Sequence, residues 1–134
     1  MHIPRSSRRL AIAGTLVVGT ALFGLAGPAD AQSPRVIQRG HCSASSTFKL
    51  KLQQEDRGLE AEYEVDQNKN GVTWNVTLTD NGHEVFSGPA TTKAPSGSFE
   101  VKARFRNNPG ADTLVAQATN PATGETCGGQ VTLG

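Results

Sequence analysis

The chain has 134 residues, of which 36% are apolar and 19% are charged, with two cysteines and a formal net charge of +1. This length is that of one domain rather than two. Three of the 13 basic residues and one of the 12 acidic residues lie within residues 1–31, which leaves 10 and 11 in residues 32–134. The resulting net charge of −1 in that part argues against nucleic acid or an anionic membrane as a partner.

The first 31 residues have the pattern of an export signal. Three arginines within residues 5–9 precede an apolar stretch at about residues 10–26, and a helix-breaking Gly-Pro pair leads to the small residues Ala29 and Ala31. These are the parts of a secretory signal in their usual order. We therefore predict cleavage after Ala31 and a secreted protein that contacts a membrane only during export. The adjacent arginines leave the general and the twin-arginine export routes both open.

Both cysteines, Cys42 and Cys127, lie in the part that we expect to be exported. An even number of cysteines in an oxidising compartment predicts a disulfide. The loop that it closes has about 85 residues, for which the chain-entropy model gives a stabilisation of roughly 4 kcal/mol. A metal or redox pair is the alternative, and His41 beside Cys42 is the nearest candidate partner for it. The other histidine of this part, His83, is distant in the sequence.

Apolar and polar residues alternate with a period of two along most of the chain after residue 45. The strand-like segments lie near residues 48–53, 59–66, 72–79, 84–91, 99–106, 114–118 and 127–133. Turn-forming residues separate them, among which Asn81-Gly82 is typical of a two-residue hairpin turn. The pattern predicts an all-β fold, a single immunoglobulin-like antiparallel β-sandwich of about seven strands. We expect it to span residues 42–134, after a flexible lead-in at residues 32–41.

Three rows of polar residues lie on the outward phase of these strands. A hairpin turn at residues 55–58 would place Lys49 and Lys51 opposite an acidic row, so that opposite charges meet across the strand pair. We interpret the acidic row mostly as a means of sheet pairing, with binding of a cation or a partner as the alternative. We interpret the other two rows as solvated faces, with binding of an acidic partner or an anionic polymer as the alternative for the basic row and a polar binding face for the threonine row. The rows are Glu60, Glu62 and Glu64; Lys102, Arg104 and Arg106; and Thr73, Asn75, Thr77 and Thr79.

One short motif is typical of a metal site. Asp66, Asn68 and Asn70 precede Gly71 in the D-x-N-x-N-G spacing of the first half of a calcium loop. Three side-chain oxygens before a sharp turn suit this hard cation. The twelfth position, where such loops have a bidentate Glu, is Thr77, and a strand follows directly. We therefore interpret this segment as a hairpin loop between the second and third strands, with calcium binding as the alternative.

No arrangement in the sequence specifies catalysis. The chain has no Gly-x-Ser-x-Gly elbow, and His83 has no serine or cysteine at a spacing that indicates a catalytic triad. A domain of about 100 residues is also small for the cleft of a glycosidase-type carboxylate pair. We therefore expect neither an enzyme nor a cofactor.

Several segments carry a resemblance to a known group of proteins. The segments are CSASSTFKLKL at residues 42–52, EYEVDQ at 62–67, GVTW at 71–74, PSGSF at 95–99 and TGETC at 123–127. They resemble small secreted actinobacterial proteins of uncharacterised function that have a single pair of cysteines. The resemblance implies export and one small β-domain, and it implies no activity, cofactor or catalytic residue.

The sequence thus favours a secreted, monomeric, non-enzymatic module that binds or interacts with an unknown partner at the cell envelope. One alternative is a carrier of a small ligand or of calcium. The other is an envelope hydrolase or a hydrolase inhibitor.

Overall fold

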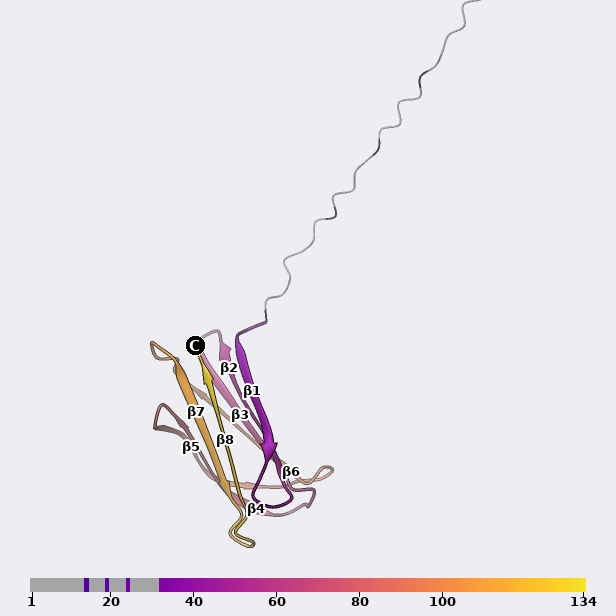
Figure 1. Ribbon diagram of the computed structural model, residues 1–134, viewed down its shortest axis with the longest axis vertical. Helices are drawn as coiled ribbons and strands as arrows, with labels where there is room; N and C mark the ends of the chain where they lie inside the picture. Colours follow the sequence, from indigo (N-terminus) through magenta and orange to yellow (C-terminus); the bar gives the residue numbers. More distant parts are fainter. Residues whose placement is uncertain (1–13, 15–18, 20–23, 25–31) are drawn as a thin grey trace, which may run out of the picture. The chain divides into compact units, whose positions relative to one another are not determined.

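The computed structural model describes residues 32–134, together with Gly14, Gly19 and Gly24 (Figure 1). The expected export signal at residues 1–31 otherwise falls outside the described residues. Every regular element of the described part is a strand. A search of the same residues finds no helix that is long and apolar enough to cross a membrane.

Eight antiparallel strands form two four-stranded sheets. The first sheet has the order β1-β2-β3-β6 and the second has the order β5-β4-β7-β8. The predicted all-β sandwich is therefore confirmed. The strands are β1 (Arg35–His41), β2 (Thr47–Glu55), β3 (Gly58–Asp66), β4 (Thr73–Asp80), β5 (His83–Thr91), β6 (Ser98–Phe105), β7 (Asp112–Thr119) and β8 (Thr126–Leu133).

The immunoglobulin-like type of sandwich is not confirmed. In that arrangement the second and third strands lie in opposite sheets. Here the tight turn after Glu55 returns the chain into the same sheet, and β2 pairs with β3 over its whole length, from Glu55 opposite Gly58 to Thr47 opposite Asp66. The chain changes sheets only later, between β3 and β4, between β5 and β6, and between β6 and β7.

Residues 32–41 include a strand, which corrects the expectation of a flexible lead-in. Strand β1 pairs with β2 over seven residues, from Arg35 opposite Gln53 to His41 opposite Thr47. On the second sheet, the backbone N–H of Gln130 donates to the side-chain oxygen of Gln38 at 2.7 Å. The alternation of apolar residues is weak here because a polar residue, Gln38, occupies the inward phase.

The two sheets enclose one apolar core. Trp74 and Tyr63 are its largest fully buried side chains. Their rings contact those of Phe48 and Phe99, with ring centres between 6.1 and 6.3 Å apart. Edge-to-face and tilted pairs of this kind add to the stabilisation that burial itself provides. The inward phase of the strands, as predicted from the alternation, supplies nearly all of this core.

The predicted turn between β4 and β5 is confirmed. Asn81 and Gly82 have positive φ values of 47° and 82°. The Asn81 side chain also fixes the turn to β7, since its Nδ2 donates to the carbonyl of Ala111 at 3.0 Å and its Oδ1 accepts the N–H of Thr113 at 2.9 Å. A bulge between Leu78 and Thr79 then shifts the register with β5.

Candidate functional site

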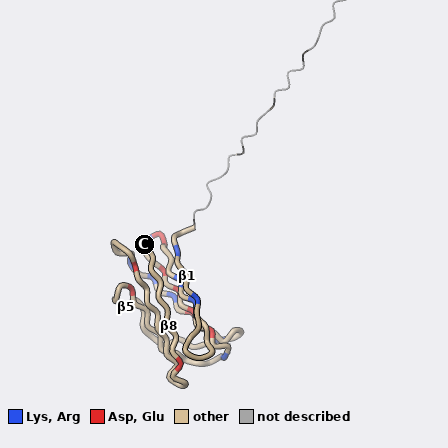
Figure 2. Tube along the Cα trace, in the orientation of Figure 1, with Lys and Arg blue, Asp and Glu red and all other residues tan. Residues whose placement is uncertain are grey.

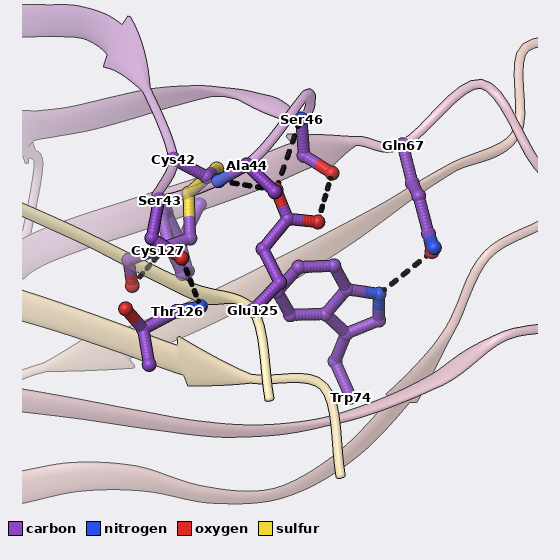
Figure 3. The surroundings of a disulfide bond; sticks show 10 residues. Cys42, Ser43, Ala44, Ser46, Gln67, Trp74, Glu125, Thr126 and Cys127 are labelled. Atoms are coloured by element: carbon purple, nitrogen blue, oxygen red, sulfur yellow. Dashed lines mark hydrogen bonds between the residues drawn. A yellow bond between two sulfur atoms is a disulfide. The ribbon is translucent and has the colours of Figure 1, made fainter. Parts of the chain in front are cut away.

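The predicted disulfide is present and joins the two sheets. Cys42 follows β1 directly, and Cys127 lies in β8, with their Cα atoms 4.4 Å apart (Figure 3). The backbone around the bridge is held from both sides. The N–H of Ser43 donates to the carbonyl of Thr126 at 2.8 Å, and the Tyr63 hydroxyl donates to the carbonyl of Cys127 at 3.0 Å. The bridge thus belongs to a firmly bonded corner of the sandwich.

A buried glutamate, Glu125, completes this corner. One carboxylate oxygen accepts the N–H groups of Ala44 and Ser46 at 3.1 and 3.0 Å, and the other accepts the Ser46 hydroxyl at 2.8 Å (Figure 3). Three donors from one loop satisfy a charge that would otherwise be costly to bury. Its role here is structural, since it holds the loop between β1 and β2 against β8. The sequence analysis did not identify Glu125, because its partners lie about 80 residues away.

The calcium-loop motif forms the connection from β3 to β4, which crosses from the first sheet to the second, so the prediction of a hairpin loop is wrong here. The Asp66 carboxylate accepts the N–H of Asn68 at 2.9 Å, as in an Asx turn, and Asn68 and Asn70 are exposed. The adjacent Gln67 side chain accepts the Trp74 indole N–H at 3.0 Å (Figure 3). Residues 32–134 contain no group of three or more His, Cys, Asp and Glu side chains that could hold a metal ion.

The outer face of the first sheet carries a ladder of ion pairs. Glu62 is buried between Lys49 at 3.3 Å and Lys51 at 2.6 Å, and Lys102 lies 4.0 Å away. Burial alone would raise the pKa of Glu62, but hydrogen bonds from Lys51 and Lys49 and the charge of Lys51 outweigh it and lower the pKa to about 2. Arg104 binds Glu60 at 2.8 Å in the same way.

This ladder confirms that opposite charges meet across β2 and β3, with Lys51 opposite Glu62. Of the predicted basic row, Lys102 and Arg104 are engaged in ion pairs with β3. The threonine row lies along β4, where the Thr73 hydroxyl bonds the Thr91 hydroxyl at 2.9 Å. Five of the ten residues in the three rows, Glu60, Glu62, Lys102, Arg104 and Thr73, thus have side-chain partners within the sheets.

A groove runs along the seam between β5 and β6. Its volume is about 590 Å³, and its walls combine apolar side chains with two lysines and one glutamate. Strands β5 and β6 are both sheet edges, so each has a side without a partner strand beyond the single bridge between Lys93 and Ser98. Phe86 of β5 lines this groove. The lining residues are Phe86, Pro89, Ala90, Thr91, Lys93, Ser98, Phe99, Glu100, Val101 and Lys102.

Two acidic residues occupy the core side of the second sheet at its opposite end from the disulfide. Asp80 ends β4 and Asp112 begins β7, and both are more than nine-tenths buried. One oxygen of each carboxyl group has no hydrogen-bond partner. Burial, followed by the charge and hydrogen bonding of Asp112, raises the pKa of Asp80 to about 6, although the charge of His83 opposes this. The sequence analysis overlooked both residues.

Comparisons with known proteins do not identify a relative of this chain: no family model, no curated protein and no solved structure matches it.

Proposed function

We propose that this protein is a secreted, non-enzymatic binding module of the cell envelope, and that it binds an extended segment of a partner protein in the groove between β5 and β6. The observation that supports this proposal is a groove with both apolar and charged side chains, bordered by free strand edges. An extended peptide can add to such an edge through main-chain hydrogen bonds, while pockets for alternate side chains supply specificity.

Of the two edges, β6 is the better receiving strand. It is regular from Phe99 to Phe105, and alternate residues direct their N–H and C=O groups away from β3. Strand β5 contains a bulge and Pro89, which lacks an N–H group to donate. Pro89 also prevents indiscriminate pairing of β5 with other strands. The incoming segment would therefore pair with β6 and lie against the apolar side chains of β5.

The charges of the groove favour an acidic partner. Lys102 is engaged by Glu100 at 3.5 Å and lies 4.0 Å from Glu62. Lys93 lines the same groove and makes no ion pair with any residue of the described part. An extended segment with apolar residues at alternate positions and a carboxylate near Lys93 fits this arrangement.

A synthetic peptide tests the proposal directly. The probe is a heptapeptide of alternating valine and threonine that begins with glutamate, titrated into isotope-labelled protein and followed by amide chemical shifts. We expect the shifts to concentrate in residues 99–105 of β6, and we expect Lys93→Glu to weaken binding about tenfold. The exposed Lys69→Glu is the matched control, because Lys69 lies outside the groove.

Binding to β6 that Lys93→Glu weakens and Lys69→Glu leaves unchanged would support the proposal. Shifts confined to other strands, or equal losses in both variants, would overturn it. A peptide with lysine in place of the leading glutamate should bind less tightly than the probe, since it would meet Lys93 with a like charge.

A further inference from the structure

The strongest unexplained feature outside the groove is the pair formed by Asp80 and Asp112. Both residues continue the apolar phase of their strands. Asp80 follows the inward residues Trp74, Val76 and Leu78, and Asp112 precedes the inward residues Leu114, Ala116 and Ala118. Two carboxyl groups thus take positions that the alternation assigns to core side chains.

The register of the strands brings the two carboxyl groups together. Asp80 lies opposite Leu114, so Asp112 is its diagonal neighbour on the same face of the sheet. Residues in this relation are within reach of each other's side chains. The Asn81 side chain, which bonds the carbonyl of Ala111 and the N–H of Thr113, ties the same two strand ends together.

Few charged groups face the pair. From β5, His83 lies in register with Asp80 and is exposed. Arg106, which follows β6, lines the same cavity of about 330 Å³ as Asp80 and His83, and Phe105 presents an apolar ring to it. Strand β8 has no charged residue, and its Leu133 lies opposite Asp112 (Figure 2). Neither Asp80 nor Asp112 forms an ion pair with a described residue.

Two adjacent buried carboxylates that form no ion pair cannot both be ionised at low cost. A single proton between them lets one carboxyl group donate to the other and removes one of the two charges. We propose that Asp80 and Asp112 share one proton in the folded protein, and that loss of this proton loosens the turn between β4 and β5 and the start of β7. The strand ends around Asp80 and Asp112 are then held together at low pH and are less stable at higher pH.

The direction of the pH effect follows from the pKa of Asp80, which rises from its ordinary 3.8 to about 6. A raised pKa in the folded state stabilises the protein fully below pH 3.8, and the stabilisation is lost as the pH rises through about 6. The change corresponds to roughly a hundredfold increase in the unfolding equilibrium constant between pH 4 and pH 7.

The first test is a carboxyl-carbon NMR titration with denaturation curves at several pH values. We expect one aspartate of the pair to titrate near pH 6. We also expect Asp80→Asn to remove most of the pH dependence between 4 and 7, because an amide can donate permanently to Asp112. Glu84→Gln is the matched control, since Glu84 is an exposed acid on the same hairpin.

A second measurement locates the effect. Hydrogen exchange should show protection at residues 81–84 and 112–113 that falls between pH 5 and pH 7.5, relative to the disulfide corner. The proposal is overturned if both aspartates titrate near pH 4, or if Asp80→Asn leaves the pH dependence unchanged. It is also overturned if calcium restores stability at pH 7.5 and perturbs both carboxyl groups, because the pair would then hold a cation instead of a proton.

Discussion

Removal of the charge of Glu62 should destabilise the sandwich more than removal of any neighbouring acid on the same face. Glu62 is buried and contacts the ammonium groups of Lys49 and Lys51. Its pKa falls from the ordinary 4.5 to about 2 in the folded protein. This lowering corresponds to about 3 kcal/mol of stability linked to the ionised form. We expect Glu62→Gln to lose about 2–3 kcal/mol at pH 7, since Gln keeps an oxygen that Lys51 can reach.

The pH dependence supplies a signature that a packing defect would not produce. A lowered pKa stabilises the folded state above pH 4.5, and this contribution is lost as the pH falls through about 2. The difference between Glu62→Gln and the unaltered protein should therefore shrink to about 0.5 kcal/mol or less at pH 2. Urea denaturation at pH 7, 4 and 2 measures it.

Glu64→Gln is the matched control for this prediction. Glu64 lies opposite both Lys49 and Glu100, so that it meets an opposite and a like charge in its two neighbouring strands. It forms no ion pair with a described residue. We expect a change within about 0.5 kcal/mol at pH 7. Equal effects of the two substitutions at pH 7 would refute the argument that Glu62 organises the ladder.

Two further predictions concern the disulfide corner. Replacement of both Cys42 and Cys127 by serine should lower the free energy of unfolding by about 4 kcal/mol, because the unfolded chain regains the conformational freedom that the bridge across 85 residues had removed. Chemical denaturation measures this loss, and a value below about 1 kcal/mol would contradict the prediction. Glu125→Ala should lower the free energy of unfolding by about 2–4 kcal/mol, because three donors lose their acceptor. Substitution of an exposed acid, Glu84→Ala, should change the melting temperature little. Similar melting temperatures for the two variants would exclude the role assigned to Glu125.

Much of the strand pattern could be predicted because every second residue of a strand faces the core. Alternation alone identified the core positions of β2, β3, β4 and β6. With the hairpin turn located, it also predicted that Lys51 faces an acid of β3, but it left Glu60 and Glu62 both open, and the structure shows Glu62. Alternation cannot assign a strand to a sheet. The connection at residues 67–71 crosses between the sheets, although its glycine and asparagines would equally suit a hairpin.

The features that the sequence analysis overlooked depend on contacts between distant residues. Strand β1 has Gln38 in the inward phase, where it stays exposed and accepts a hydrogen bond from the Gln130 N–H of β8. Asp80 and Asp112 are polar residues at inward positions, so that a search for apolar alternation ends β4 before Asp80 and begins β7 after Asp112. The sequence feature that could have identified this pair is an acidic residue at an inward position at the end of a strand. Two such residues on neighbouring strands indicate a pair of buried carboxyl groups.

The position of the disulfide also determines how the folded unit responds to tension. Since Cys42 and Cys127 are joined, a force applied between the two ends of residues 32–134 passes through the sulfur bridge. The backbone of residues 43–126 is therefore not pulled taut. Only β1 and the part of β8 beyond Cys127 can be peeled away, because every other strand lies inside the covalent loop. The oxidised unit thus lengthens only through these two end segments, whereas reduction of one bond allows the whole sandwich to be drawn out.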